Sequence, residues 1–556
     1  MATPEPKTRE NDANNSNSNN NSNNRKQRLR IACSSLPFSG HMHPLISLAE
    51  ELSTRYRNRD ENKNEVYVVT LPFGAQKIES RCKALGIRVV GLSSVGAATF
   101  DSEEALLAWS KPKVVFAKLA ETLKLSYEEA LDAIKPDVIV SDFCCLASQE
   151  YAVSRKIPLV INWPGPFQTL WDLVRPVVNA DSNHLYFATG GLFVSYVGCS
   201  LFRLLAWANA ADLGKLADGI QRSVTCGNSM VLVHSFWGLE QPQYLFPPNI
   251  VPVGPIEKVF SKRPDFSKSH PELHSVLETW RKNDFRKILL VTTGTVIQLE
   301  EWMVRMLWEA LELLSRDSNV SILWSLKEGP QKFLSKEQLQ HPSFFICKWL
   351  PQPALLASDL VDGVFTHCGW NGTSECVSGG KPVVVLPFFG DQMTNAKLLL
   401  KAGCAVAVAP IPTFNMDSSG HSAYYCCAQS ATTTTKNDRG WFDLGECLRR
   451  RFQKSELTVE NVVEACHTLL NDPCFARAAK KLQALSTGPG KGREFACDLI
   501  EHAGHHGLTH LSDSGHARNL TGHRPLLVTL AMGGLLGGAL AAAVASFGVV
   551  ARIQRR

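Results

Sequence analysis

The feature that most constrains the fold is an alternation of short apolar runs with amphipathic stretches, which occurs twice along the chain. In the first half, buried strands are expected at 29–34, 66–71, 87–90, 137–141, 158–162 and 231–234. In the second half, they are expected at 287–292, 321–325, 344–347, 363–366, 383–386 and 405–408. Strands that alternate with helices predict parallel sheets covered by helices. We therefore expect two doubly wound α/β domains that face each other across a cleft, where a ligand can bind.

Composition divides the 556 residues further. The first 28 residues are rich in Asn and Ser, and we expect them to be disordered because they hold too little apolar surface to fold. The other expected segments are a first domain at 29–255, a linker at 256–280, a second domain at 281–485 with a loop insertion at 411–440, a helix at 486–503 that returns toward the first domain, and a polar tether at 504–524.

The far C-terminus has a different character. Residues 525–551 carry no charge and are rich in Leu, Ala, Gly and Val. That length can cross a bilayer core of about 30 Å as a helix. A buried core helix is the alternative, although no polar face is visible. Because the N-terminus has no apolar leader, we expect a single-pass C-terminal membrane anchor with the catalytic part in the cytosol, or a cytoplasmic protein if this helix is not inserted.

Charge and motif spacing exclude several classes of protein. The 58 basic and 52 acidic residues leave a net charge of only +6, which does not favour nucleic-acid binding. The 16 cysteines show no zinc-binding spacing. The glycines and the lysine at 488–492 lack the full P-loop pattern, and no dinucleotide fingerprint follows the first strand. We expect no metal and no cofactor.

The segment 349–392 carries the most specific pattern. The expected strand at 363–366 runs into a helix start that contains Gly369 and Gly372. Backbone amides at such a start favour a bound phosphate, and glycines let it approach the backbone. Trp349 offers a flat face for a base, and Glu375, one turn into the helix, can accept ribose hydroxyls. Taken singly, each residue is more often structural; together, at these spacings, the residues favour a functional site that binds a phosphate group.

These 44 residues resemble the plant secondary product glycosyltransferase box of family 1 UDP-glycosyltransferases, which opens with Trp and ends with Asp-Gln or Asp-His. The resemblance extends over about 29–502. It implies the GT-B fold, with two Rossmann-like domains and a UDP-sugar donor bound by the second. The residues that it implies for the donor are Thr295, Trp349, Leu350 and Gln352 near the nucleotide, His367, Asn371, Gly372 and Thr373 at the phosphates, Glu375 at the ribose, and Trp370, Asp391 and Gln392 at the sugar.

The resemblance also indicates the sugar. In this family a final Gln usually accompanies UDP-glucose, and Trp370 replaces an Arg of some glucuronosyl enzymes. Three departures from the family pattern are Gly372 in place of Ser, Ala357-Ser358 in place of an early His, and Thr292–Thr295 in place of Ser-Phe-Gly-Ser.

The first domain offers the base that transfer to a hydroxyl needs. After the first expected strand, a turn is expected at Pro37 and Gly40, followed by a helix from Pro44 to Leu52. His41 lies here in the sequence Gly-His-Met-His-Pro, which resembles the family's catalytic His motif and favours His41 over His43. Asp142 follows the strand at 137–141, at the same sheet edge, and the family places the partner carboxylate there. The structural alternatives are a helix-start histidine and a helix N-cap.

The expected function is therefore inverting, metal-independent transfer of glucose from UDP-glucose to a hydroxyl or carboxyl group of a small lipophilic acceptor, such as a phenolic, terpenoid or sterol-like alcohol. UDP-galactose or another UDP-sugar is an alternative donor. A non-catalytic UDP-sugar-binding membrane protein is the alternative from another functional class. We expect a monomer.

Overall fold

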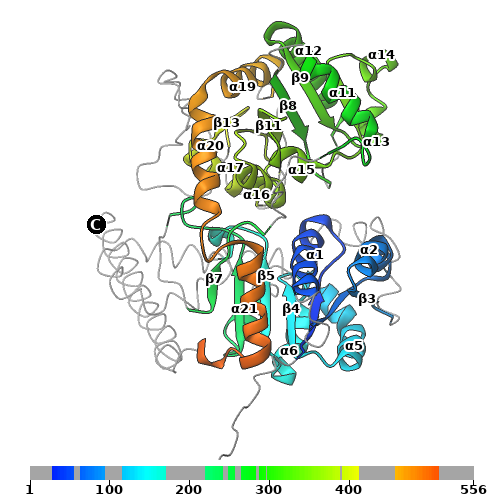
Figure 1. Cartoon of the computed structure of the whole chain (residues 1–556), viewed down its shortest axis with the longest axis vertical. Coiled ribbons are helices and arrows are strands. Elements are labelled where there is room, and N and C mark those ends of the chain that lie inside the picture. The colour runs from blue at the N-terminus through cyan, green and yellow to red at the C-terminus, as the bar shows by residue number, and fades with distance from the viewer. Residues whose placement is uncertain are drawn as a thin grey trace, which may run out of the picture.

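The computed structural model describes residues 28–55, 63–93, 100, 116–170, 219–241, 248–256, 265–282, 287–295, 297, 299–388, 391–411 and 457–511. These residues form two lobes, each built around a parallel sheet (Figure 1). Residues 1–27 of the segment expected to be disordered, 412–440 of the expected insertion and all of 525–551 lie outside the described residues. Within the described part, no helix has both the length and the apolar character that a membrane crossing requires.

The first lobe holds a seven-stranded sheet in the order β3-β2-β1-β4-β5-β6-β7. Its strands are β1 (Arg30–Ser34), β2 (Glu65–Thr70), β3 (Arg88–Gly91), β4 (Val138–Asp142), β5 (Leu159–Trp163), β6 (Ser229–Val233) and β7 (Ile250–Pro252). Its helices are α1 (Ser39–Thr54), α2 (Pro72–Ala84), α5 (Phe116–Ile134) and α6 (Leu146–Arg155). Successive residues of β1 point to opposite faces: Ile31 and Cys33 pack with α1, whereas Ala32 packs with α5 and α6.

The second lobe repeats this arrangement with six strands in the order β10-β9-β8-β11-β12-β13. The strands are β8 (Lys287–Thr292), β9 (Val320–Ser325), β10 (Phe344–Cys347), β11 (Gly363–Thr366), β12 (Val383–Val385) and β13 (Ala405–Ala407). The helices are α11 (Pro271–Lys282), α12 (Glu301–Ser318), α13 (Glu328–Gln331), α14 (Lys336–Leu339), α15 (Gln352–Ala357), α16 (Trp370–Gly379), α17 (Gln392–Lys401), α19 (Val459–Asn471) and α20 (Pro473–Ser486). Helices α12 and α19 cover one face, and α11, α15, α16 and α20 cover the other.

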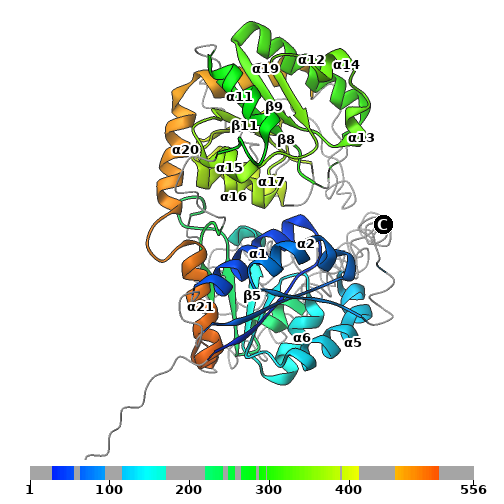
Figure 2. The same cartoon turned by 45° about the vertical axis from the view of Figure 1, so that its right-hand side comes forward.

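The two lobes are tied together at one side. Figures 1 and 2 show α20 reaching down from the second lobe to α21 (Gly492–His506), which packs along the first. The contact is apolar through Cys497 and Ile500 and is framed by ion pairs, with Arg55 Nη1 2.6 Å from Asp498 Oδ1. Helix α21, which follows the second lobe in sequence, thereby stabilises the first lobe.

Three sequence expectations need correction. Helix α1 begins at Ser39, so the expected turn at Gly40 is already helical and His41 lies in its first turn. The expected linker at 256–280 contains most of α11, whose amphipathic pattern buries Leu273, Leu277 and Trp280. The expected tether at 504–524 begins with the last turn of α21 and the 3-10 turn η3 (Thr509–Leu511).

Candidate active site

The strand order reverses between β1 and β4 in the first sheet and between β8 and β11 in the second. Ligands of open α/β sheets bind at such a point. The carboxyl ends of β1 and β4 therefore define the site in the first lobe, and those of β8 and β11 define it in the second. Helices α1 and α16 begin at these two edges and face each other across the junction of the lobes (Figures 1 and 2).

The first lobe brings His41 and Asp142 into contact. Nδ1 of His41 lies 2.9 Å from Oδ1 of Asp142, which also accepts a 3.0 Å hydrogen bond from the Cys144 backbone N–H. A carboxylate only accepts, so we assign the proton between them to Nδ1, which leaves Nε2 of His41 as the acceptor. Asp142 is fully buried, whereas 21% of the His41 side chain is exposed. The pair therefore presents a basic nitrogen at the surface of the lobe.

Electrostatics favour this basicity. Burial alone would lower the pKa of His41, but the charge and hydrogen bond of Asp142, with the charge of Asp391 from the other lobe, outweigh it and raise the pKa. The Asp391 side chain keeps contact with solvent, but the surrounding protein desolvates its carboxyl group and raises the pKa of Asp391. The hydrogen bond from Asn395 and the charge of His41 partly oppose this shift.

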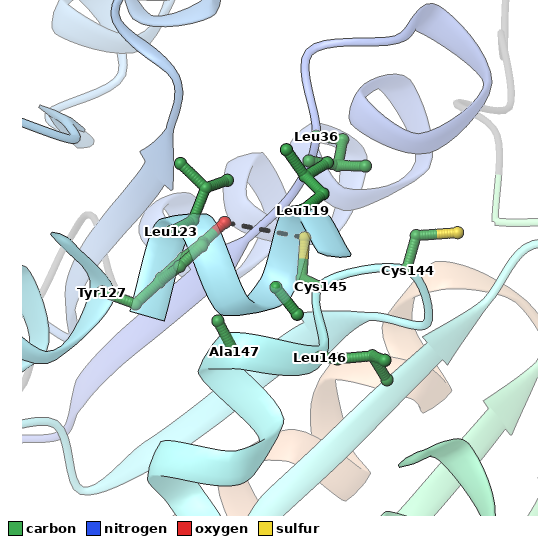
Figure 3. Close-up of a pocket in the computed structure, with 9 residues that line it drawn as sticks. Leu36, Leu119, Leu123, Tyr127, Cys144, Cys145, Leu146 and Ala147 are labelled. Atoms are coloured by element: carbon green, nitrogen blue, oxygen red, sulfur yellow. Dashed lines mark hydrogen bonds between the residues drawn. The ribbon is translucent and has the colours of Figure 1, made fainter. Parts of the chain in front are cut away.

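The dyad is backed by apolar packing. A small cavity next to the β4–α6 turn is lined by Leu36, Leu119, Leu123, Leu146 and Cys145, and the Tyr127 hydroxyl donates to Cys145 Sγ over 3.6 Å (Figure 3). These surroundings keep water from the Asp142 carboxylate and strengthen its interaction with His41.

Three side chains of types that can bind a metal ion also lie close together here. Ligand atoms of His41, Asp142 and Cys144 lie within 4.8 Å of one another. Burial, followed by the nearby Asp142 charge, raises the pKa of the Cys144 thiol well above its usual value, so this sulfur stays protonated and is a poor metal ligand. The arrangement suits proton transfer better than metal binding.

In the second lobe, the loop from β11 to α16 is shaped around His367. The Cys368 backbone has a φ of 63°, and its N–H donates to Thr366 Oγ1 over 3.2 Å, so the chain reverses before the helix starts. The His367 ring packs between Gly294 and Gly369, and a Cβ at either glycine would overlap it. Burial lowers the pKa of His367 to about 4 despite a hydrogen bond with the Thr292 backbone, so the ring is neutral at pH 7.

The start of α16 leaves polar groups without partners. The backbone N–H groups of its first turn have no intrahelical acceptor. Among the described residues, no partner is found for the buried Nδ1 of His367, Nε1 of Trp370 or hydroxyl of Thr373. Because buried polar atoms are normally hydrogen-bonded, this concentration at one helix N-terminus points to a polar, anionic ligand.

The remaining expected donor residues surround this point. Trp349 is 59% exposed, and the His43 ring of the other lobe approaches it edge-on at 6.4 Å between ring centres. Leu350 is buried, and Gln352 Nε2 donates to Glu375 Oε2 over 2.7 Å. Asp391 accepts a 2.8 Å bond from Asn395, and the buried Gln392 accepts one of 2.9 Å from the Phe388 N–H.

Polar contacts bridge the two lobes at the same place. Asn371 Nδ2, in the first turn of α16, donates to the Ser39 carbonyl at the start of α1 over 3.4 Å. The structure thus brings the predicted base and the predicted phosphate site to opposite sides of one junction.

Comparison with known proteins agrees with this geometry. The sequence model described as "UDP-glucoronosyl and UDP-glucosyl transferase" matches residues 192–419. A UDP-glycosyltransferase of Talaromyces amestolkiae is 32% identical over 66% of this chain and 65% of its own length, just under two thirds. UDP-glycosyltransferase 73E1 of Stevia rebaudiana is 24% identical over 66% of this chain and 80% of its own length.

These similarities indicate that the chain is a glycosyltransferase similar to the UDP-glycosyltransferases. Solved structures agree on the two-domain GT-B fold. A Medicago truncatula glycosyltransferase complexed with UDP-glucose matches 86% of this chain and 100% of its own, with a TM-score of 0.58 and 16% identity. A UDP-glucose:anthocyanidin 3-O-glucosyltransferase in complex with UDP matches 86% and 99%, with a TM-score of 0.55 and 19% identity.

Within this glycosyltransferase, two residues near the site were not identified from the sequence. Lys327 follows β9, and its ammonium group donates to the carbonyl of Thr295, which brings a positive charge to the carboxyl edge of the sheet. Asn395 links Asp391 to the Cys368 carbonyl, which it reaches over 2.9 Å. The available sequence signals were that Lys327 follows a strand and that Asn395 lies one helical turn beyond Asp391. Lysine and asparagine are common at exposed positions, so these signals did not single out either residue.

Proposed function

We propose that this glycosyltransferase moves glucose from UDP-glucose to the hydroxyl of a small lipophilic acceptor, with inversion at the anomeric carbon. The observation that carries the proposal is the His41–Asp142 pair, which faces the unsatisfied N-terminus of α16 across the lobe junction. A base opposite an anion site is what transfer with a diphosphate leaving group requires.

The reaction would run in one displacement. Nε2 of His41 accepts the proton of the acceptor hydroxyl as its oxygen forms a bond to the anomeric carbon. The bond from that carbon to the diphosphate oxygen breaks, and UDP leaves with the bonding electrons. Asp142 stabilises the imidazolium that forms. The α16 amides, which lie beside His367, stabilise the charge that develops on UDP.

The donor residues retain the roles that the family resemblance implies. Trp349, Leu350 and Gln352 would hold the uracil and its nucleoside, and Glu375 the ribose. Trp370, Asp391 and Gln392 would hold the sugar, and Thr295 would lie beside the diphosphate. The final Gln and the names of relatives such as the Fragaria ananassa anthocyanidin 3-O-glucosyltransferases support glucose. The Phe38 and Phe143 rings, whose centres lie 6.1 Å and 5.3 Å from that of the His41 ring, support a lipophilic acceptor.

The decisive experiment measures UDP release by the full-length protein with a panel of phenols and terpenoid alcohols. UDP-glucose, UDP-galactose and UDP-glucuronate are compared as donors. We expect release with at least one acceptor, a preference for UDP-glucose, and full activity in the presence of a chelator. UDP binding without release for any pair of substrates would instead support the non-catalytic UDP-sugar-binding protein, an alternative that Gly372 keeps open.

The membrane anchor stays a proposal of its own. We propose that 525–551 inserts as a single C-terminal helix and leaves the catalytic lobes in the cytosol, and that the protein is a monomer. Carbonate extraction of membranes from expressing cells, compared with a chain that ends at 511, tests this point. Equal release of both proteins into the soluble fraction would contradict insertion.

A further inference from the structure

A group of histidines lies at the far end of α21, away from the candidate active site. Figure 1 shows α21 running from the junction of the lobes to the opposite end of the first lobe. Its last turn is therefore remote from the N-terminal ends of α1 and α16. His502 and His506 lie in this last part of the helix, and His510 lies in the short turn η3 that follows. Neither the dyad nor the donor site uses them.

The three rings lie close together. His502 and His506 are four residues apart and share one helix face, with ring centres 4.9 Å apart. The His510 ring approaches His502 nearly edge-on, with 5.3 Å between the ring centres and an interplanar angle of 82°. His502 therefore stands between two other imidazoles, one from its own helix and one from the next element.

The position of His510 is fixed by the fold around it. Gly507 ends the helix with a φ of 67°, a conformation that favours glycine and reverses the chain. Leu508 is fully buried, and its N–H donates to Asn228 Oδ1 over 2.9 Å. These contacts hold η3 against the first lobe and return His510 toward the face that carries His502.

The two ring spacings around His502 match that of imidazoles that share one ion. Two imidazoles that share a tetrahedral ion through metal–nitrogen bonds of about 2 Å have ring centres about 5 Å apart. All three side chains are exposed, so their rings can turn to direct one nitrogen each at a common point.

We propose that His502, His506 and His510 form a site for one divalent transition-metal ion of the zinc, nickel or copper class. Imidazole is a preferred ligand of these ions, and water completes the coordination. Asp498, one turn before His502, is already paired with Arg55 and is not included. Bound metal would brace the reversal at Gly507 and hold the end of α21 on the first lobe, independently of catalysis.

The test is a calorimetric titration of the full-length protein, without a polyhistidine tag and freed of metal by a chelator, with Zn²⁺. We expect one equivalent to bind. Replacing any of the three ligands, as in His502→Ala, His506→Ala or His510→Ala, should weaken zinc binding by at least roughly 10–100-fold. Losses of that size follow removal of a residue that only hydrogen-bonds to a metal ligand, whereas these three would contact the metal directly. The matched control is His505→Ala, whose ring lies 6.1 Å from that of His506.

Thermal unfolding gives a second readout. Zn²⁺ should raise the Tm of the wild type and of His505→Ala and leave the Tm of His502→Ala unchanged. Because the rings are exposed, the metal-free Tm should be nearly the same for all variants, which shows that they fold. Cys144→Ala should retain the zinc response, which separates this site from the group around Asp142. Equal zinc affinity in His502→Ala, His506→Ala, His510→Ala and the wild type would overturn the proposal.

Discussion

The two halves of the candidate active site are built by different means. The first lobe uses two side chains, His41 and Asp142, which are 101 residues apart in sequence and share a 2.9 Å hydrogen bond. The second lobe uses backbone: a helix N-terminus, a left-handed residue at Cys368 and glycines packed on His367. The first half of the site therefore depends on the charge of individual groups, whereas the second half depends on the path of the main chain. Substitutions should therefore affect catalysis in one lobe and donor binding in the other.

The largest effect is expected from His41→Ala. Loss of the general base should lower kcat by about 10²–10⁴-fold, because the acceptor hydroxyl keeps its proton. UDP affinity, measured by calorimetry, should stay within about twofold, since the donor is held by the other lobe. A His43→Ala variant is the neighbouring control for turnover. Normal turnover in His41→Ala would disprove the base assignment.

Asp142→Asn should come next, with kcat reduced by about 100-fold. The pH profile sharpens this prediction. With Asp142 present the pKa of His41 is raised, and activity falls as the pH drops through that pKa because the base becomes protonated. Without the carboxylate charge, burial dominates and the pKa of His41 falls, so the acidic limb of kcat/KM should move to lower pH. An unchanged limb would show that another group titrates.

In the second lobe, Gly369→Ala should weaken UDP binding by about 10-fold, equivalent to about 1.4 kcal/mol, through local strain and lost contact. A Cβ at Gly369 would lie 2.5 Å from Nε2 of His367 and would displace the ring. Turnover at saturating donor should change less than affinity does. The matched control is Gly372→Ser, because a Cβ at Gly372 meets its nearest neighbours at an ordinary 3.6 Å and 3.8 Å. Equal losses in both variants would contradict this role of the His367 packing.

The smallest effect is expected from Lys327→Met. Removing one positive charge near Thr295 should raise the KM for UDP-glucose a few-fold, equivalent to about 1 kcal/mol, and should leave kcat nearly unchanged. The nearby Lys332→Met, which lies over the Phe333 ring, is the control for a general change of charge. A loss of kcat with an unchanged KM would place Lys327 in the chemical step instead.

The same contrast explains what could be predicted from the sequence. Strands at 287–292, 344–347 and 363–366 match the observed bounds, because buried strands of a parallel sheet read as short apolar runs. The start of α1 was misplaced, since Gly40 normally indicates a turn, and β7 was missed because it has three residues and ends in Pro252.

Within the site, the donor half lies mostly in one contiguous segment and could be recognised from spacing. The contact between His41 and Asp142 required the strand order that places β1 beside β4. The packing of His367 against Gly294 joins segments more than 70 residues apart in sequence, and no local pattern reports it. Contacts between the lobes, such as Asn371 with Ser39, depend on how two separate domains meet and could not be derived from either half.

The most direct test is a crystal structure with a non-transferable UDP-glucose analogue and an acceptor identified by the panel. We predict that Nε2 of His41 lies within about 2.6–3.2 Å of the acceptor oxygen, that this oxygen faces the anomeric carbon, and that the diphosphate rests on the first turn of α16. A complex in which the diphosphate binds elsewhere, or in which His41 does not reach the acceptor oxygen, would contradict the account.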